Sequence, residues 1–276
     1  MANNTINLSA GARQNLLSLQ RTSSLISTVQ TRLSTGLKVN SALDDASAFF
    51  TSKALTNRAE DLDGLKSNID LAINTIEAGI NGIDGITELV EQAKGLANNA
   101  KATGDTAEQS SLAVQFDELL NQINDIANDS SFNGTNLIQA TPDDLDVDFN
   151  EAGTSDLTIL GLDSTTGASG LNITASTNDF GDAAAITAAL TDLNSALVTL
   201  RSNAATLGSN NTVLQTRLTF TEDLVGTLEE GAGQLTLADL NEESANLLAL
   251  QTREQLGINS LALASQSERS ILALFG

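Results

Sequence analysis

The sequence predicts a mainly α-helical fold in which both chain ends form a long antiparallel helical bundle or coiled coil, with a small β-hairpin region in the middle. The first observation behind this prediction is the stretch 62–97, where apolar residues recur at alternating steps of three and four. This rhythm is the seam of a helix that packs lengthwise on other helices. The second is the stretch 130–182, which is rich in Asp, Ser, Thr, Asn and Gly and carries short alternating runs.

The composition argues against several classes of function. The 276 residues carry a formal net charge of −22 and include no His, Cys, Trp or Tyr. Such a charge disfavours binding to nucleic acid or to an anionic membrane. Without His there is no imidazole chemistry and no His-based metal site. Because aromatic residues that could line a pocket are few, we expect no enzyme and no cofactor.

No targeting or spanning segment is predicted. Residues 1–12 lack the cationic and apolar regions of a secretory signal peptide. No run of eighteen or more apolar residues suggests a transmembrane helix.

The first helix is expected to begin near residue 6 and to end at Gly36, a plausible C-cap glycine. Leu19, Ile26 and Leu33 lie seven residues apart on one edge of this helix. Polar residues occupy the intervening seam positions, so the helix is marginal by itself and needs partners to fold.

The next helices are predicted to form an antiparallel hairpin. A helix start is expected at 41–45, with Ser41 or Asp44 as the cap, and the helix continues over 46–58 and 62–97, with or without a break. A turn at 103–105 separates it from a third helix over about 107–128, which has a facing apolar stripe.

Short strands are expected over 145–149, 157–160 and 171–173, with turns at Asn133-Gly134 and at 167–170. This acidic region reads as a solvated surface. A calcium-binding loop is a more specific alternative, but the residue spacing of an EF-hand is not present.

The C-terminal part returns to helix. A helix is expected from about Ala183, with a bend at 208–211 left open, and Gly231 and Gly233 are expected to break it. A final helix over about 238–274 closes on Ile271, Leu272, Leu274 and Phe275. An apolar chain end of this kind must be covered by something.

Three segments, taken in order, resemble bacterial flagellin. The first is RLSTGLKVNSALDDA at residues 32–46, which is similar to the N-terminal pattern of that family. The second is FNGTNL at 132–137, and the third is the C-terminal region that begins at Ala238-Asp239 and ends in SILALF at 270–275. Together they anchor nearly the whole chain.

The resemblance implies a subunit of the flagellar filament that polymerises into a helical tube for swimming motility. It implies a terminal coiled-coil domain at 1–40 and 237–276, and a second-layer helical domain at 41–236 with a β-containing insert at about 139–182. Packing in the inner core is then expected of Leu19, Ile26, Leu33, Leu247, Ile258, Leu261, Ile271, Leu272, Leu274 and Phe275. A motif at the layer boundary comprises Arg32, Gly36, Asn40, Asp44 and Asp45, in which the two acids either pair with Arg32 or Lys38 or simply cap a helix.

The resemblance also implies partners and a location. The chain is expected to leave the cell unfolded through the flagellar export apparatus, with a flagellin chaperone, and to end in the extracellular filament. There it contacts copies of itself, the filament cap, hook–filament junction proteins and, in some filaments, other flagellins.

One segment departs from the family. Many flagellins carry Gln-Arg-x-Arg-Glu-Leu-Ala on the second-layer helix, which an animal Toll-like receptor detects. Here Gln92, Lys94 and Gly95 stand at the two Arg positions and the Glu position. We therefore expect weak or no activation of that receptor.

Three other kinds of protein share some of these features but fit the sequence less well than a filament subunit. A hook–filament junction protein, a flagellin homologue, often has Pro where Ala46 stands. An enzyme-bearing flagellin would need a larger insert and, for a zinc protease, His. A generic helical bundle or adhesin would remain monomeric.

Overall fold

The computed structural model describes residues 10–275, except for the side chains of 268, 269 and 271–275. It is mainly helical, with one small sheet, as expected. The elements are α1 (Ala10–Thr35), α2 (Ala46–Ala102), α3 (Thr106–Asp129), β1 (Leu145–Asp148), β2 (Asp156–Ile159), the short 3₁₀ helix η1 (Asn178–Phe180), α4 (Ala183–Thr236) and α5 (Leu240–Phe275).

The chain divides into two compact units. The terminal unit comprises the chain up to residue 58 and from residue 227 onward, and the central unit comprises residues 59–226. These divisions fall inside α2 and α4, whereas the resemblance implies domain boundaries at 40/41 and 236/237.

The central unit is built on the seam that the sequence predicts in α2. Its buried members are Leu62, Ile69, Ala72, Ile76, Ile83, Ile86, Val90, Ala93 and Ala97. A turn at 103–105 leads into α3, whose first turn is capped because the Asp105 carboxylate accepts the Ala107 N–H at 2.9 Å. Phe116, Leu120 and Ile123 of α3 complete the facing stripe.

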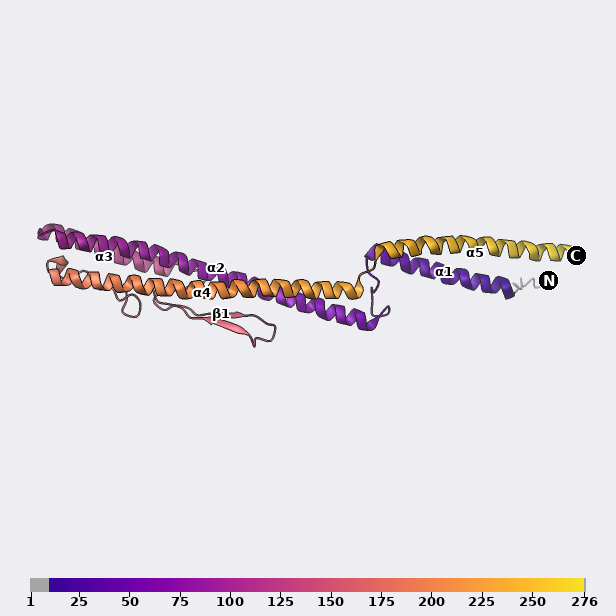
Figure 1. Cartoon of the computed structure of the whole chain (residues 1–276), viewed down its shortest axis with the longest axis horizontal. Helices are drawn as coiled ribbons and strands as arrows, with labels where there is room; N and C mark the ends of the chain where they lie inside the picture. Colours follow the sequence, from indigo (N-terminus) through magenta and orange to yellow (C-terminus); the bar gives the residue numbers. More distant parts are fainter. Residues whose placement is uncertain (1–9, 276) are drawn as a thin grey trace, which may run out of the picture. The chain divides into compact units, whose positions relative to one another are not determined.

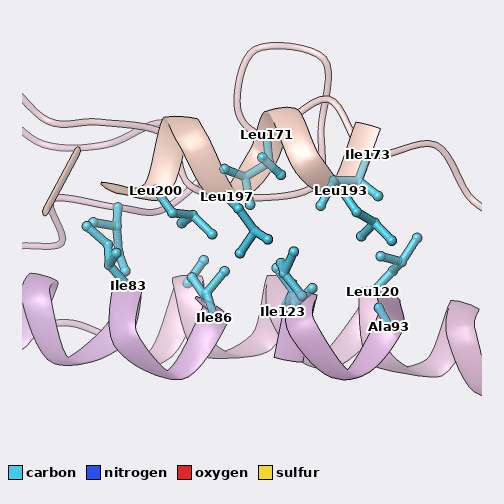
Figure 2. Packing of buried hydrophobic residues seen from close by; sticks show 14 of the residues in the cluster. Ile83, Ile86, Ala93, Leu120, Ile123, Leu171, Ile173, Leu193, Leu197 and Leu200 are labelled. Atoms are coloured by element: carbon cyan, nitrogen blue, oxygen red, sulfur yellow. The ribbon is translucent and has the colours of Figure 1, made fainter. Parts of the chain in front are cut away.

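Helix α4 covers this hairpin. Figure 2 shows Leu193, Leu197 and Leu200 directed toward the side chains of α2 and α3, among them Ile86 and Ile123. By length and composition alone α4 could cross a membrane. Its leucines instead form part of the core of the central unit, so its apolar character is accounted for by helix packing.

The insert between α3 and α4 holds the β-hairpin and a polar anchor. Strands β1 and β2 are antiparallel, with Leu145 opposite Ile159 and Val147 opposite Leu157, and Val147 and Ile159 are buried. Asn124 of α3 accepts hydrogen bonds from the backbone and the hydroxyl of Thr166, at 2.9 and 3.0 Å. These two hydrogen bonds tie the insert to α3.

Two expectations about secondary structure were wrong. Leu171 and Ile173 are buried but do not form a strand. Their N–H groups bind Thr165 and Thr166 within a turn, and Asn172 between them is left-handed at φ 51°. Such a φ breaks the alternation that a strand requires.

The second error concerns α4, which runs through Gly231 and Gly233 to Thr236 and is also unbroken at 208–211. A helical glycine costs only about 0.5–1 kcal/mol relative to Ala. At Gly231 the neighbouring Leu55 side chain would lie 3.6 Å from an added Cβ. Packing can thus outweigh a propensity cost of this size.

Candidate assembly surface

The terminal helices α1 and α5 pack side by side and antiparallel (Figure 1). Asn15 of α1 donates a hydrogen bond to the Ser260 hydroxyl of α5 at 3.5 Å. The helices approach closely at Gly257, where an added Cβ would lie 2.9 Å from Cδ2 of Leu19. A side chain at this position would have to displace the end of the Leu19 side chain.

Arg32 and Glu243 form the one ion pair that joins the two helices in the described part of the chain. Arg32 Nη1 lies 2.9 Å from Glu243 Oε1, and Glu243 is only 8% exposed. The second carboxylate oxygen, Oε2, is buried without a hydrogen-bond partner. A groove of about 410 Å³ beside it has Leu25, Val29 and Leu250 among its lining residues.

The segment after α1 ties the two chain ends together through the backbone. Gly36 has a φ of 74°, and its N–H binds the Arg32 carbonyl at 2.8 Å, which ends the helix. The Lys38 N–H binds the Thr236 carbonyl, and the Ala238 N–H binds the Gly36 carbonyl. This pairing holds the end of α1 beside the start of α5.

Asp44 and Asp45 bind backbone N–H groups and form no ion pair with any described residue, and the cap of α2 is Asp45, so the expectation of Ser41 or Asp44 as the cap was wrong. The Asp44 carboxylate accepts the hydroxyl of Ser41 and the N–H groups of Ser41 and Asn40, at 3.0 to 3.1 Å. The hydroxyl of Ser41 is the main cause that holds the pKa of Asp44 below its usual value, with the two backbone N–H groups next. Asp45 accepts the Ala48 N–H at the start of α2. The Arg32 alternative does not hold, because Arg32 pairs with Glu243, and Lys38 binds the Gln234 carbonyl.

The residues expected to pack in the inner core differ in burial. Ile26 is buried, while Leu19, Leu33, Leu247 and Leu261 are half-buried. Ile258 is 48% exposed and so is largely outside the α1–α5 contact of one copy. The side chains of Ile271, Leu272, Leu274 and Phe275 lie outside the described residues.

Much of the apolar surface of the terminal helices faces solvent. Of the described side chains on α5, only Glu243 is buried. The exposed large apolar residues of α1 and α5 are Leu16, Leu17, Leu25, Leu240, Leu248, Leu256, Ile258 and Leu263. We call this set the assembly surface.

The positions that depart from the receptor motif lie on α2 in the central unit. Gln92 and Gly95 line a groove of about 690 Å³ with Leu96 and Val114, the last of which is 67% exposed. Lys94 points elsewhere and donates to the Asn194 side chain at 2.7 Å. The structure therefore does not bring the three residues into one cluster.

Sequence reasoning missed two residues that the structure makes prominent. Glu243 follows another acid, Glu242, in the C-terminal segment that resembles flagellin, and its burial depends on the register of α1 against α5. Asn136 is 3% exposed; its amide group donates to the carbonyls of Ala127 and Asn128, and its oxygen accepts from Ile138 and Gln139. Its place in FNGTNL was the available signal.

The chain matches two family models. Residues 6–142 match the bacterial flagellin N-terminal helical region, and residues 190–275 match the bacterial flagellin C-terminal helical region. Flagellin FljO of Caulobacter vibrioides is 36% identical over 276 residues, all of both chains. A flagellin of Brucella melitensis is 28% identical over 94% of this chain and 95% of its own. The crystal structure of Bacillus cereus flagellin gives a TM-score of 0.49 at 21% identity, covering 56% of this chain and 88% of that one.

Paired terminal helices, a helical hairpin between them in the sequence, and family models matched at both ends define a class of self-assembling structural proteins. This chain is a member of the bacterial flagellin family. Its function is that of a subunit of the extracellular flagellar filament. The relatives described above are flagellins, which disfavours the role of a hook–filament junction protein.

Proposed function

We propose that the assembly surface on α1 and α5 is the part of this filament subunit that neighbouring copies cover. The observation that carries the proposal is that α5 has no buried apolar side chain among those described, although it is rich in leucine. Burying a leucine contributes roughly 1.5–3 kcal/mol, whereas ordering each backbone residue costs roughly 1–2 kcal/mol. One copy therefore gains too little from its own α1–α5 contact, and neighbours supply the rest.

In this proposal the terminal segments 1–40 and 237–276 form the inner core, and 41–236 forms the layer around it. The residues of the inner core are those named for it above, and the segment with Arg32, Gly36, Asn40, Asp44 and Asp45 joins the two layers. Contacts of this kind repeat head to tail and produce an open helical polymer.

The proposal extends to export and to the other partners. A chain without cysteine has no disulfide to obstruct threading in an unfolded state. We assign it the flagellar export apparatus, a flagellin chaperone, the filament cap, junction proteins and other flagellins as partners, and a structural role without catalysis.

The test compares exposed leucines of matched chemistry. Leu256→Ser and Leu263→Ser alter α5 residues that are 64% and 70% exposed, and Leu160→Ser alters a control residue of the insert that is 63% exposed. Seeded polymerisation followed by sedimentation measures the critical concentration of monomer. Both α5 variants should raise it by about tenfold or more, because each removes about 1.5 kcal/mol of apolar burial.

Leu160→Ser should assemble like the parent chain. Equal assembly by all three variants would show that neighbours do not bury this part of α5. Removal of residues 270–276 gives a coarser test of the same surface and should leave a soluble monomer that forms no filaments.

A further inference from the structure

The contacts between α1 and α5 define one antiparallel register. Arg32 meets Glu243, Asn15 meets Ser260, and Leu19 meets Gly257. As one moves toward the start of α1, one moves by the same number of residues toward the end of α5. In this register Arg21 lies at the level of Glu254.

Arg21 and Glu254 repeat the spacing of the ion pair that is formed. Arg21 precedes Arg32 by the same eleven residues by which Glu254 follows Glu243. Eleven residues make just over three turns at about 3.6 residues per turn, so each pair of like charges shares one face of its helix. The two helices thus carry two facing Arg and Glu positions of identical chemistry. We call Arg32 with Glu243 the first rung, and Arg21 with Glu254 the second rung.

The second rung is open in the isolated copy. No ion pair joins Arg21 to Glu254 within residues 10–275; Arg21 is exposed, whereas Glu254 is half-buried. An exposed ion pair contributes little to stability, too little to hold two long side chains in one geometry. An open rung is therefore expected while water surrounds it.

Charge leaves these two residues few other partners. Residues 1–43 contain Arg13, Arg21, Arg32 and Lys38 but no Asp or Glu, so α1 offers Arg21 no acid. On α5, no basic residue stands three or four positions before or after Glu254, so α5 offers Glu254 no partner at helical spacing. Once neighbours cover the helices, each charge would lose contact with water, and a buried charge without a partner is strongly destabilising.

We propose that Arg21 and Glu254 of the same copy close a second ion pair when the filament forms, and that the two rungs together fix the register of α1 against α5. The inference rests on the proposed role of the terminal helices in assembly. Arg21 and Glu254 are positioning residues, because they set which apolar side chains the pair presents to its neighbours.

The test exchanges the two charges. Arg21→Glu and Glu254→Arg each place like charges on the rung and should raise the critical concentration by more than about tenfold. The double variant restores opposite charges and should return to within about threefold of the parent chain. Arg201→Glu, on the exposed face of α4, changes the net charge as Arg21→Glu does and should have no effect.

A mixture of the two single variants separates a pair within one copy from a pair between copies. If the rung lies within one copy, the mixture should assemble as poorly as each variant alone. Recovery of the mixture would overturn the proposal in favour of a contact between copies. Normal assembly of the single variants, or failure of the double variant to recover, would also overturn it.

The outcome is independent of the test of the assembly surface. If the leucine variants fail to assemble while the charge variants assemble normally, the proposed function stands and only the second rung is lost. Circular dichroism of each monomer controls for folding, because the central unit contains neither Arg21 nor Glu254.

Discussion

Gly82 and Gly95 of α2 offer the same substitution in two different surroundings. A Cβ added at Gly82 would lie 2.6 Å from Cδ1 of Ile138 and 2.8 Å from Cβ of Ser130, and still closer to the Ser130 hydroxyl. A Cβ at Gly95 would meet nothing within 4 Å. Because Ile138 is fully buried, it cannot move aside into solvent. The two glycines therefore have different reasons to be present.

The expected energies follow from these distances. Gly→Ala within a helix stabilises by about 0.5–1 kcal/mol, and this gain applies at both positions. Overpacking a close contact costs about 1–3 kcal/mol, which applies only at Gly82. Gly95→Ala should therefore increase the free energy of unfolding by about 0.5–1 kcal/mol. The free energy of unfolding of Gly82→Ala should be lower than that of Gly95→Ala by about 1–3 kcal/mol.

Urea unfolding followed by circular dichroism measures both variants. A third variant tests the cause: Ile138→Val removes Cδ1 and costs about 0.5–1.5 kcal/mol alone. Combined with Gly82→Ala it should cost less than the sum of the two changes, since it relieves one of the clashes. The reasoning is refuted if Gly82→Ala is as stable as Gly95→Ala.

Three further outcomes are expected. Gly257→Val should weaken filament assembly in a sedimentation assay, because the two added methyl groups and the Cβ must displace the Leu19 side chain between α1 and α5. The pKa of Asp44 is lowered from its usual value of 3.8, so its ionised carboxylate stabilises the folded turn at any pH above 3.8. This stabilisation is lost as the pH falls through the lower pKa of the folded state. Nuclear magnetic resonance of the Ser41 amide should report that loss in the parent chain and not in Asp44→Asn. In a Toll-like receptor reporter assay the purified monomer should be weakly active or inactive, and potency equal to that of an enteric flagellin would contradict the reading of Gln92, Lys94 and Gly95.

The helical part of the fold was accessible from sequence because its signals are long and repeated. The three-four seam of α2 continues over many turns, so single exceptions such as the glycine at position 79 do not hide it. The C-cap at Gly36 was also legible, because a glycine that follows a stripe of apolar residues matches a left-handed C-terminal residue.

The insert was less accessible because its pattern is short. Leu171 and Ile173 alternate like strand residues, yet the chain around them forms a turn that buries both side chains. Asn172 between them makes this turn possible by adopting a left-handed φ. Three residues cannot distinguish these two arrangements. The burial of Glu243 was hidden for another reason, since it depends on a register between segments more than two hundred residues apart.

The two units should respond separately to mutation. The central unit buries a large apolar cluster, whereas the terminal helices expose many of their large apolar side chains. The buried apolar cluster of the described residues runs from Ile69 to Leu214 and lies in the central unit. On α5 the buried side chain is instead that of Glu243. Gly82→Ala should therefore lower the urea midpoint and leave the critical concentration for assembly unchanged. Leu256→Ser should raise the critical concentration and leave the urea midpoint unchanged. If either variant changed both quantities together, stability within a copy and contact between copies would depend on the same residues, and the division of labour between the two units would be lost.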